Sequence, residues 1–199
     1  MIKRTGATQY RKFLKDLHLE HIWESEKIPE ASNFNKLVRK LIRIKDESEW
    51  QEAIYKKNKL RTYRNLKTRL IIEPYVIELD RAQRRQLTML RGGTNKLRIE
   101  IGRRLGESEK ERVCNVCLCN ETEDEKHFLL RCSMYVRERV QMIERIKNEC
   151  KLYYIDRLDE DSQLQILIGI GWRKQSKQIR EIVLEYIRKA YDIRKRYIA

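Results

Sequence analysis

The stretch that decides the fold of this 199-residue chain is residues 114–135, CNVCLCNETEDEKHFLLRCSMY. It contains four of the five cysteines and one of the three histidines. A disulfide framework, a redox pair and a metal site all concentrate cysteines in this way. The choice among these three decides most of what the sequence says about function.

The spacing of the four residues favours a closed metal site. Cys114 and Cys117 form C-x2-C, which lets a tight turn direct both sulfur atoms at one ion. His127 and Cys132 complete the pattern C-x2-C-x9-H-x4-C. Three thiolates and one imidazole fill a tetrahedral zinc sphere without a position for water. The sequence therefore predicts one structural Zn²⁺, bound by Cys114, Cys117, His127 and Cys132 in a zinc knuckle (CCHC) at residues 112–135.

The competing interpretations of these cysteines are weaker. A redox C-x2-C begins a helix in a βαβ setting, and no such pattern surrounds this one. The first residues, MIKRTGATQYRKFLKDLH, lack the apolar core of a secretory signal, so we expect an intracellular, reducing location, nucleus or cytoplasm, where disulfides are rare. Cys119 is an open alternative to Cys117 as the second ligand, through C-x4-C. Cys150 is expected to be an ordinary thiol, and His18 and His21 to lie on a helix surface.

Composition and periodicity predict an all-α fold, an irregular helical bundle. The chain has two prolines, seven glycines and 38% charged residues, and no apolar run is long enough to span a membrane. Apolar residues recur at helical spacing along most of the chain. Helices are expected around residues 10–17, 34–44, 50–70, 79–90, 94–105 (capped by Thr94 or Asn95), 136–146 and 179–197, with a buried run at 164–172. Residues 94–105 also alternate like a strand at Leu97, Ile99 and Ile101, and helix is the preferred interpretation. The apolar residues of the helix at 136–146 are Val136, Val140, Ile143 and Ile146.

Two domains are expected. Residues 1–49 match no motif and are expected to form a helical appendage. Residues 50–199 are expected to form one helical unit that contains the knuckle. Pro74 is expected to interrupt the helices there, and Gly92-Gly93 to end one of them.

The net charge of +15 favours nucleic acid as a partner. Residues 56–69 contain seven basic residues and no acid, residues 84–112 nine against four, and residues 173–199 nine against three. Solvated helix faces are the alternative interpretation of each run. The expected phosphate contacts are Arg91, Lys96, Arg98, Arg103 and Arg104 beside the knuckle, and secondly Lys56, Lys57, Lys59, Arg61 and Arg64. Tyr63 and Tyr135 either stack on bases or pack in the core.

Four segments together resemble a known family. These are KLRTYRNLK (59–67), RRQLTMLRGGTNKLRIEIGR (84–103), RVCNVCLCNETEDEKHFLLRCSMYVRER (112–139) and EYIRKAYDIRKR (185–196). In this order they are similar to the C-terminal region of reverse transcriptases from non-LTR (LINE-like) retrotransposons. The resemblance implies a zinc knuckle that helps to hold template RNA or target DNA, with the same four ligands. Ser133 stands where that family usually has proline, and Cys119 is an extra cysteine.

Catalytic residues are not expected. The [FY]-x-D-D turn that binds the Mg²⁺ ions of such polymerases is missing, and no endonuclease constellation occurs. We expect a non-catalytic, zinc-stabilised module that binds RNA or DNA. The alternatives are a protein-interaction module that docks on a polymerase or another protein, or a decayed retroelement fragment without activity.

Overall fold

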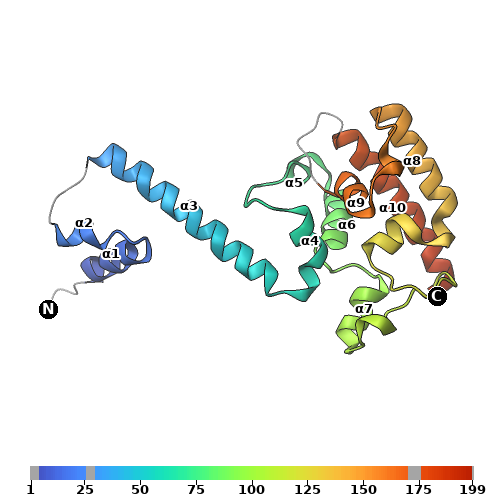
Figure 1. The fold of residues 1–199 in the computed structure, drawn as a ribbon, viewed down its shortest axis with the longest axis horizontal. Helices are drawn as coiled ribbons and strands as arrows, with labels where there is room; N and C mark the ends of the chain where they lie inside the picture. The colour runs from blue at the N-terminus through green and yellow to red at the C-terminus, as the bar shows by residue number, and fades with distance from the viewer. Residues whose placement is uncertain (1–4, 26–29, 170–175, 199) are drawn as a thin grey trace. The chain divides into compact units, whose positions relative to one another are not determined.

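The structure, a computed structural model, describes residues 5–25, 30–169 and 176–198. Its fold is all-α, and the described residues contain no β-strand, only an isolated antiparallel bridge between Val113 and Thr122 (Figure 1). No helix in these ranges is long and apolar enough to cross a membrane. The longer helices are α1 (Thr5–Asp16), α3 (Ala31–Tyr55), α6 (Arg81–Arg91), α7 (Arg98–Leu105), α8 (Val136–Cys150), α9 (Glu160–Leu167) and α10 (Ser176–Ile198).

The chain divides into two compact units, Met1–Lys56 (unit 1) and Lys57–Ala199 (unit 2). The division follows the end of α3, and the boundary expected at residues 49/50 falls inside that helix. Each unit is described by itself.

Unit 1 consists of α1, the short helix α2 (Glu20–Glu24) and α3. Its buried core is small: Leu14, Leu17 and Leu19, with partly buried side chains packed against them. His18 has a φ of 57° in the turn between α1 and α2. His18 and His21 are both exposed, as expected. Most of this unit is therefore surface.

Unit 2 has a much larger core, built where α10 packs against α6, α8 and α9. The buried face of α10 is the one predicted from its apolar spacing, from Ile179 to Ala190. Phe128 lies 5.3 Å from Tyr135 and 5.1 Å from Tyr191 between ring centroids. The hydroxyl of Tyr186 donates to the Phe128 carbonyl at 2.7 Å. These contacts join the cysteine-rich segment to α10.

Several predicted elements are confirmed. Pro74 starts the short helix α5 (Pro74–Glu78), and α6 ends at Arg91 before Gly92. Asp80 and Gln83 form a capping box at the start of α6. The helical interpretation of residues 94–105 is right, although α7 begins only at Arg98. The run at 164–172 is buried at Leu164, Leu167 and Ile168, and its residues 170–172 lie outside the described residues.

Two predictions about helices are wrong. The helix expected over residues 50–70 is interrupted after Tyr55, and the chain resumes as a 3-10 turn, η1 (Asn58–Leu60), and α4 (Arg61–Leu66). Contacts within unit 2 fix α4, because Arg61 and Thr62 bind Glu125. On α8, Val136 and Val140 are exposed, whereas Met142, Ile146 and Cys150 are buried. Burial against α10 selects this other face of α8.

Candidate metal centre

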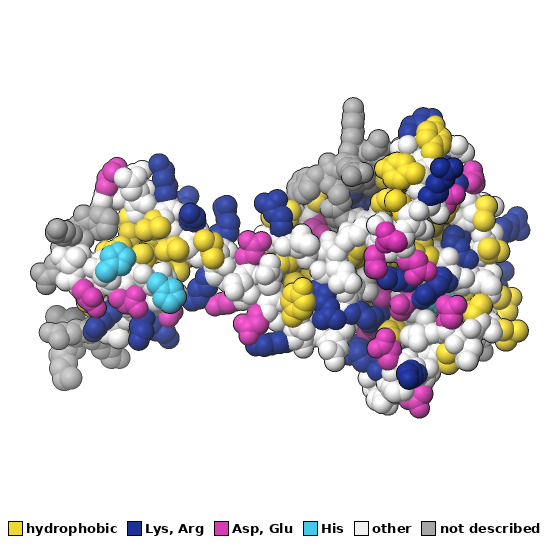
Figure 2. All heavy atoms as spheres, viewed as in Figure 1, with side chains coloured by type: hydrophobic (Ala, Val, Ile, Leu, Met, Phe, Trp, Pro, Cys, Tyr) yellow, Lys and Arg dark blue, Asp and Glu magenta, His cyan; other side chains and the backbone are white. Residues whose placement is uncertain are grey.

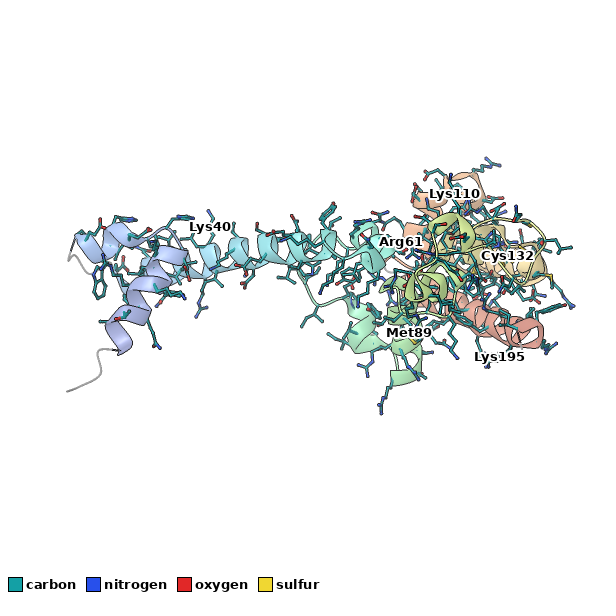
Figure 3. All side chains as sticks on the ribbon, turned by 90° about the horizontal axis from the view of Figure 1, so that it is seen from below. Lys40, Arg61, Met89, Lys110, Cys132 and Lys195 are labelled. Atoms are coloured by element: carbon teal, nitrogen blue, oxygen red, sulfur yellow. The ribbon has the colours of Figure 1, made fainter. Side chains whose placement is uncertain are left out.

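Four side chains at the cysteine-rich segment can hold a metal ion together. The ligand atoms of Cys114, Cys117, His127 and Cys132 all lie within 4.8 Å of one another, and all four residues are buried. Cys117 Sγ lies 3.4 Å from His127 Nε2. The set is the one predicted from spacing, and Cys132 is labelled in Figure 3.

A narrow loop positions the first two cysteines. The backbone N–H of Cys114 donates to the carbonyl of Glu121 at 2.9 Å, which closes the loop beside the Val113–Thr122 bridge. The N–H of Val116 donates to Cys114 Sγ at 3.4 Å. A backbone N–H two residues after a cysteine thus points at its sulfur, which stabilises negative charge there.

A single π-helical turn positions the other two ligands. The turn η3 (His127–Arg131) begins at the histidine and ends at Cys132, whose N–H donates to the His127 carbonyl at 2.7 Å. The carboxylate of Asp124 accepts the N–H of His127 at 2.7 Å and so caps the start of this turn. The wider π-turn brings the ligand atoms of His127 and Cys132 into the same group.

The imidazole of His127 is oriented by a carboxylate. Its Nδ1 lies 3.2 Å from Glu121 Oε2, and Arg131 Nε lies 3.2 Å from the same oxygen. A proton on Nδ1 leaves the Nε2 lone pair directed at the sulfur atoms. Metal-binding histidines commonly have a carboxylate on the second ring nitrogen, which fixes the tautomer and raises ligand basicity.

The thiols are hard to ionise without a cation. A hydrogen bond with Cys132 and burial together raise the pKa of Cys114 to about 12. Burial also raises the pKa of Cys117 to about 11. A bound divalent cation reverses this preference, because thiolates are the ligand form and metal binding releases their protons.

The remaining two cysteines are not members of this group. Cys119 is exposed, with its Sγ 3.6 Å from Ser133 Oγ, and it is not one of the four clustered residues. The hydrogen bond with Ser133 lowers the pKa of the Cys119 thiol. Cys150 is buried in the core of unit 2. The geometry therefore selects Cys117, and not Cys119, as the second donor.

Two glutamates of the cysteine-rich segment are buried, which the sequence analysis did not anticipate. Glu123 is fully buried; its carboxylate accepts the N–H of Arg98 at 2.7 Å and pairs with Arg194 of α10. It therefore caps α7, where Thr94 or Asn95 was expected. Cys114 Sγ lies 3.6 Å from the same carboxylate. Glu123 thus connects the metal centre to both α7 and α10.

Glu125 forms a second buried anchor. Its carboxylate accepts hydrogen bonds from Arg61 at 2.7 Å, Thr62 at 2.7 Å and Asn95 at 2.9 Å. Burial raises the pKa of Glu125, although Arg61 favours its charged form. Arg61 also pairs with buried Glu100, which in turn binds Arg103 at 2.7 Å. The locally acidic residues 120–127 thus contain two buried carboxylates, Glu123 and Glu125, that belong to a network of charged side chains.

These contacts correct several of the expected phosphate contacts. Arg91 is only 1% exposed and pairs with Glu73 at 2.8 Å, so it does not face solvent. Arg61 is committed to Glu100 and Glu125, and Arg103 to Glu100. Arg98 pairs with Glu107 at 2.5 Å. These four arginines are paired with carboxylates of unit 2. Glu73 and Glu125 lie 18 and 64 residues from their partners Arg91 and Arg61. Glu100 and Glu107 lie in the same run as Arg103 and Arg98, where a count of charges does not show which of them pair.

The other expected contacts are at least partly exposed. Lys57 and Lys96 are exposed, and Lys59 is partly exposed. Arg104 donates to the carbonyls of Glu100 and Asn95 and has no carboxylate partner in the part of the chain that the structure describes. Arg64 is partly exposed, and Lys56, the last residue of unit 1, pairs with Glu52. In Figure 2 dark blue and magenta side chains are interleaved over the middle of unit 2.

The two tyrosines considered for base stacking are not free platforms. Tyr135 is buried against Phe128. The ring of Tyr63 is approached by the Arg91 guanidinium and by Lys67 Nζ, each 5.8 Å from its centroid. Tyr135 therefore packs in the core, which was the second alternative for these residues.

Arg112 and Arg131 are the basic residues nearest in sequence to the clustered cysteines, but their contacts are with other groups. Arg112 donates to the carbonyls of Glu107 and Ile99, and Arg131 binds Glu121, Asp124 and Glu160. Arg194, paired with Glu123 beside Cys114, is a positive charge next to the centre that the sequence did not reveal.

Comparisons of the chain with protein-family models, with curated proteins and with solved structures gave no match.

Proposed function

We propose that unit 2 is a non-catalytic, zinc-stabilised module that binds nucleic acid. The carrying observation is the buried set of three sulfurs and one oriented imidazole. Ligands of one tetrahedral zinc ion lie roughly 3.5–4 Å apart, a spacing close to the 3.4 Å between Cys117 and His127. Such a knuckle holds all four positions with protein donors, which supports a structural role for the ion.

Charge supports nucleic acid as the partner. Unit 2 has 33 lysines and arginines against 21 acids. Many acids are occupied by internal pairs, as described above for Glu73, Glu100, Glu123 and Glu125. The proposal agrees with the resemblance to the tail of non-LTR retrotransposon reverse transcriptases, in which this region would hold template RNA or target DNA.

The contact surface that we propose consists of Lys59, Lys96 and Arg104. Two observations bring these residues together. A side chain at Gly93, whose φ is +63°, would strike the backbone carbonyl of Lys59, so η1 lies against the turn that precedes Lys96. Arg104 binds the Asn95 carbonyl of that turn at 3.3 Å. Phosphates approach such a surface through charge alone, without base-specific recognition.

The test has two parts. Elemental analysis of the purified chain should give one zinc per chain. Binding of labelled single-stranded RNA and DNA should weaken steeply with salt, and the Lys59→Gln/Lys96→Gln/Arg104→Gln variant should reduce the slope of log K against log salt by about 2. A matched variant, Lys110→Gln/Lys151→Gln/Arg157→Gln, removes three other exposed charges of unit 2. Equal slopes for both variants would contradict the proposed surface.

A protein-interaction role is the second candidate, because one part of unit 2 is apolar and exposed. Ile72 and Ile77 are 71% and 76% exposed, and Leu70 and Val76 are also on the surface. Several exposed aliphatic residues around one short helix are typical of a protein contact. Ile72→Ser/Ile77→Ser should then abolish capture of a co-purifying protein while nucleic-acid binding is unchanged.

A further inference from the structure

Unit 1 has two helix surfaces that carry only positive charge. Lys36, Arg39, Lys40 and Arg43 follow the spacing i, i+3, i+4, i+7 and so share one face of α3; Lys40 is labelled in Figure 3. All four are exposed. Within the described residues none of them has an acidic partner. Like charges at these spacings repel each other, so the face is better suited to a polyanion than to solvent alone.

The second basic surface lies on α1. Arg11, Lys12 and Lys15 are exposed and share one face with Thr8. In the part of the chain that the structure describes, these three cations also lack acidic partners. Neither α1 before Asp16 nor α3 before Asp46 contains an acidic residue. This differs from unit 2, where cations and carboxylates are paired.

Aromatic side chains are exposed on the same pair of helices. Tyr10 is 45%, Phe13 37% and Trp23 41% exposed. The Tyr10 ring lies 6.1 Å from that of Trp23 and 6.4 Å from that of Phe13. In Figure 2 hydrophobic side chains are visible on the surface of unit 1, bordered by dark blue ones. Exposed aromatic rings beside unpaired cations are the combination that binds single-stranded nucleic acid.

A cavity joins the two features. It has a volume of about 480 Å³, within the range of small-ligand pockets. One wall is the basic face of α1, and Trp23 lies on the other wall with Glu20 and Glu24. The cations suit phosphate groups, the indole suits a base, and the two carboxylates can accept hydrogen bonds from exocyclic amino groups of cytosine or adenine. Duplex DNA or RNA does not expose its bases for this contact.

We propose that unit 1 is a second nucleic-acid-binding surface, selective for single strands, with Trp23 as its stacking residue. The basic faces of α1 and α3 bind the phosphate backbone. This surface is separate from Lys59, Lys96 and Arg104 and does not depend on the metal centre.

The first test uses the full chain and fluorescein-labelled oligo-adenosine, oligo-deoxycytidine and a blunt duplex. Trp23→Ala should weaken binding to the single strands about 5-fold or more, and binding to the duplex less than 2-fold. The control Tyr153→Ala removes another exposed aromatic residue, in unit 2, and should leave all affinities unchanged. Circular dichroism checks that both variants are folded. Wild-type affinity of Trp23→Ala for single strands would overturn the proposal.

The second test removes the basic face of α3. Lys36→Gln/Arg39→Gln/Lys40→Gln/Arg43→Gln should lower the salt slope for single strands by about 3. If this variant leaves the salt slope unchanged and the Lys59→Gln/Lys96→Gln/Arg104→Gln variant lowers it, only the function proposed for unit 2 is supported. The opposite result leaves only unit 1 as the binding surface.

The third test observes the stacking residue directly. The chain has three tryptophans, so Trp50→Phe/Trp172→Phe leaves Trp23 as the only indole. Addition of oligo-deoxycytidine should quench its emission, because a stacked base quenches indole fluorescence. Unchanged emission at saturating oligonucleotide would overturn the assignment of Trp23.

Discussion

Both units consist of helices with a modest apolar content, and the contacts that stabilise these helices differ between the two units. Unit 2 surrounds a buried cysteine–histidine group with salt-bridged glutamates and a large core. Unit 1 has three buried leucines in its core, and its long helix α3 has one basic face without an acidic partner among the described residues. Buried ionic contacts hold together segments that are distant in sequence, whereas unit 1 depends on neighbouring helices. The difference teaches that cations paired with buried carboxylates are a feature of unit 2, whereas basic helix faces without acidic partners are found among the described residues of unit 1.

Loss of a metal ligand should have the largest effect. Cys132→Ser should abolish zinc binding, and unit 2 should unfold at 25 °C, since structural zinc contributes about 10–16 kcal/mol and domains are stable by about 5–15 kcal/mol. Hydrogen exchange of the α8 and α10 amides reports unit 2 alone. Exchange of the α1 amides in unit 1 should not change. If a chelator leaves the protection of the α8 and α10 amides unaltered, the metal is not what stabilises unit 2.

Removal of one buried charge should have the next largest effect. Glu123→Gln keeps the shape but places an amide against Arg194, and it should lower the free energy of unfolding of unit 2 by about 3–5 kcal/mol. Zinc content should remain one per chain. Exposed Glu109 offers the control, since Glu109→Gln should change stability by less than about 0.5 kcal/mol. Denaturant unfolding measures the free energy of unfolding of both variants. Equal free energies for Glu123→Gln and Glu109→Gln would show that the pair of Glu123 with Arg194 does not stabilise unit 2.

The third effect belongs to unit 1. Leu14→Ala empties the centre of its small core and should cost about 2–4 kcal/mol locally. Hydrogen exchange of α1 and α2 amides should accelerate, while the amides of α8 and α10 keep their protection. Leu37→Ala, at an exposed position of α3, is the control. Simultaneous loss of protection in both units would mean that they unfold as one body.

The smallest effect is expected at the extra cysteine. Cys119→Ser should retain one zinc per chain and change stability by less than about 0.5 kcal/mol, because the thiol is exposed and outside the ligand group. Cys117→Ser should lose the metal. Elemental analysis distinguishes them; zinc loss in Cys119→Ser would reverse the assignment of the second ligand.

The spacing of residues that are near in sequence was sufficient to predict much of the helical fold and the four residues of the candidate metal centre. The four ligands fall within 19 residues, from Cys114 to Cys132, and the helical turn that carries two of them is short enough to infer from sequence. The buried stripe of α10 and the end of α6 at Gly92 likewise depend on near neighbours.

Long-range polar contacts could not be inferred in this way. From the sequence alone, Arg91 resembles a surface cation, because the sequence does not show its pairing with Glu73. Glu123 likewise resembles a solvated residue, because its partner Arg194 lies on α10. The face of α8 that is buried is likewise decided by its packing partner, and the valines at positions 136 and 140 gave the wrong face. A count of charges along one segment contains no information about partners 71 residues away, the separation of Glu123 and Arg194.

We expect binding of a cation at the candidate metal centre to depend on Arg194, near the end of α10. The Glu123 carboxylate lies beside the Cys114 thiol, which must become anionic to bind a cation, and among the described residues Arg194 is the cation paired with that carboxylate. A product trimmed before residue 194 would retain every donor atom yet bind the cation more weakly. By reciprocity, cation uptake would protect that terminal segment from trimming to the same degree in free energy.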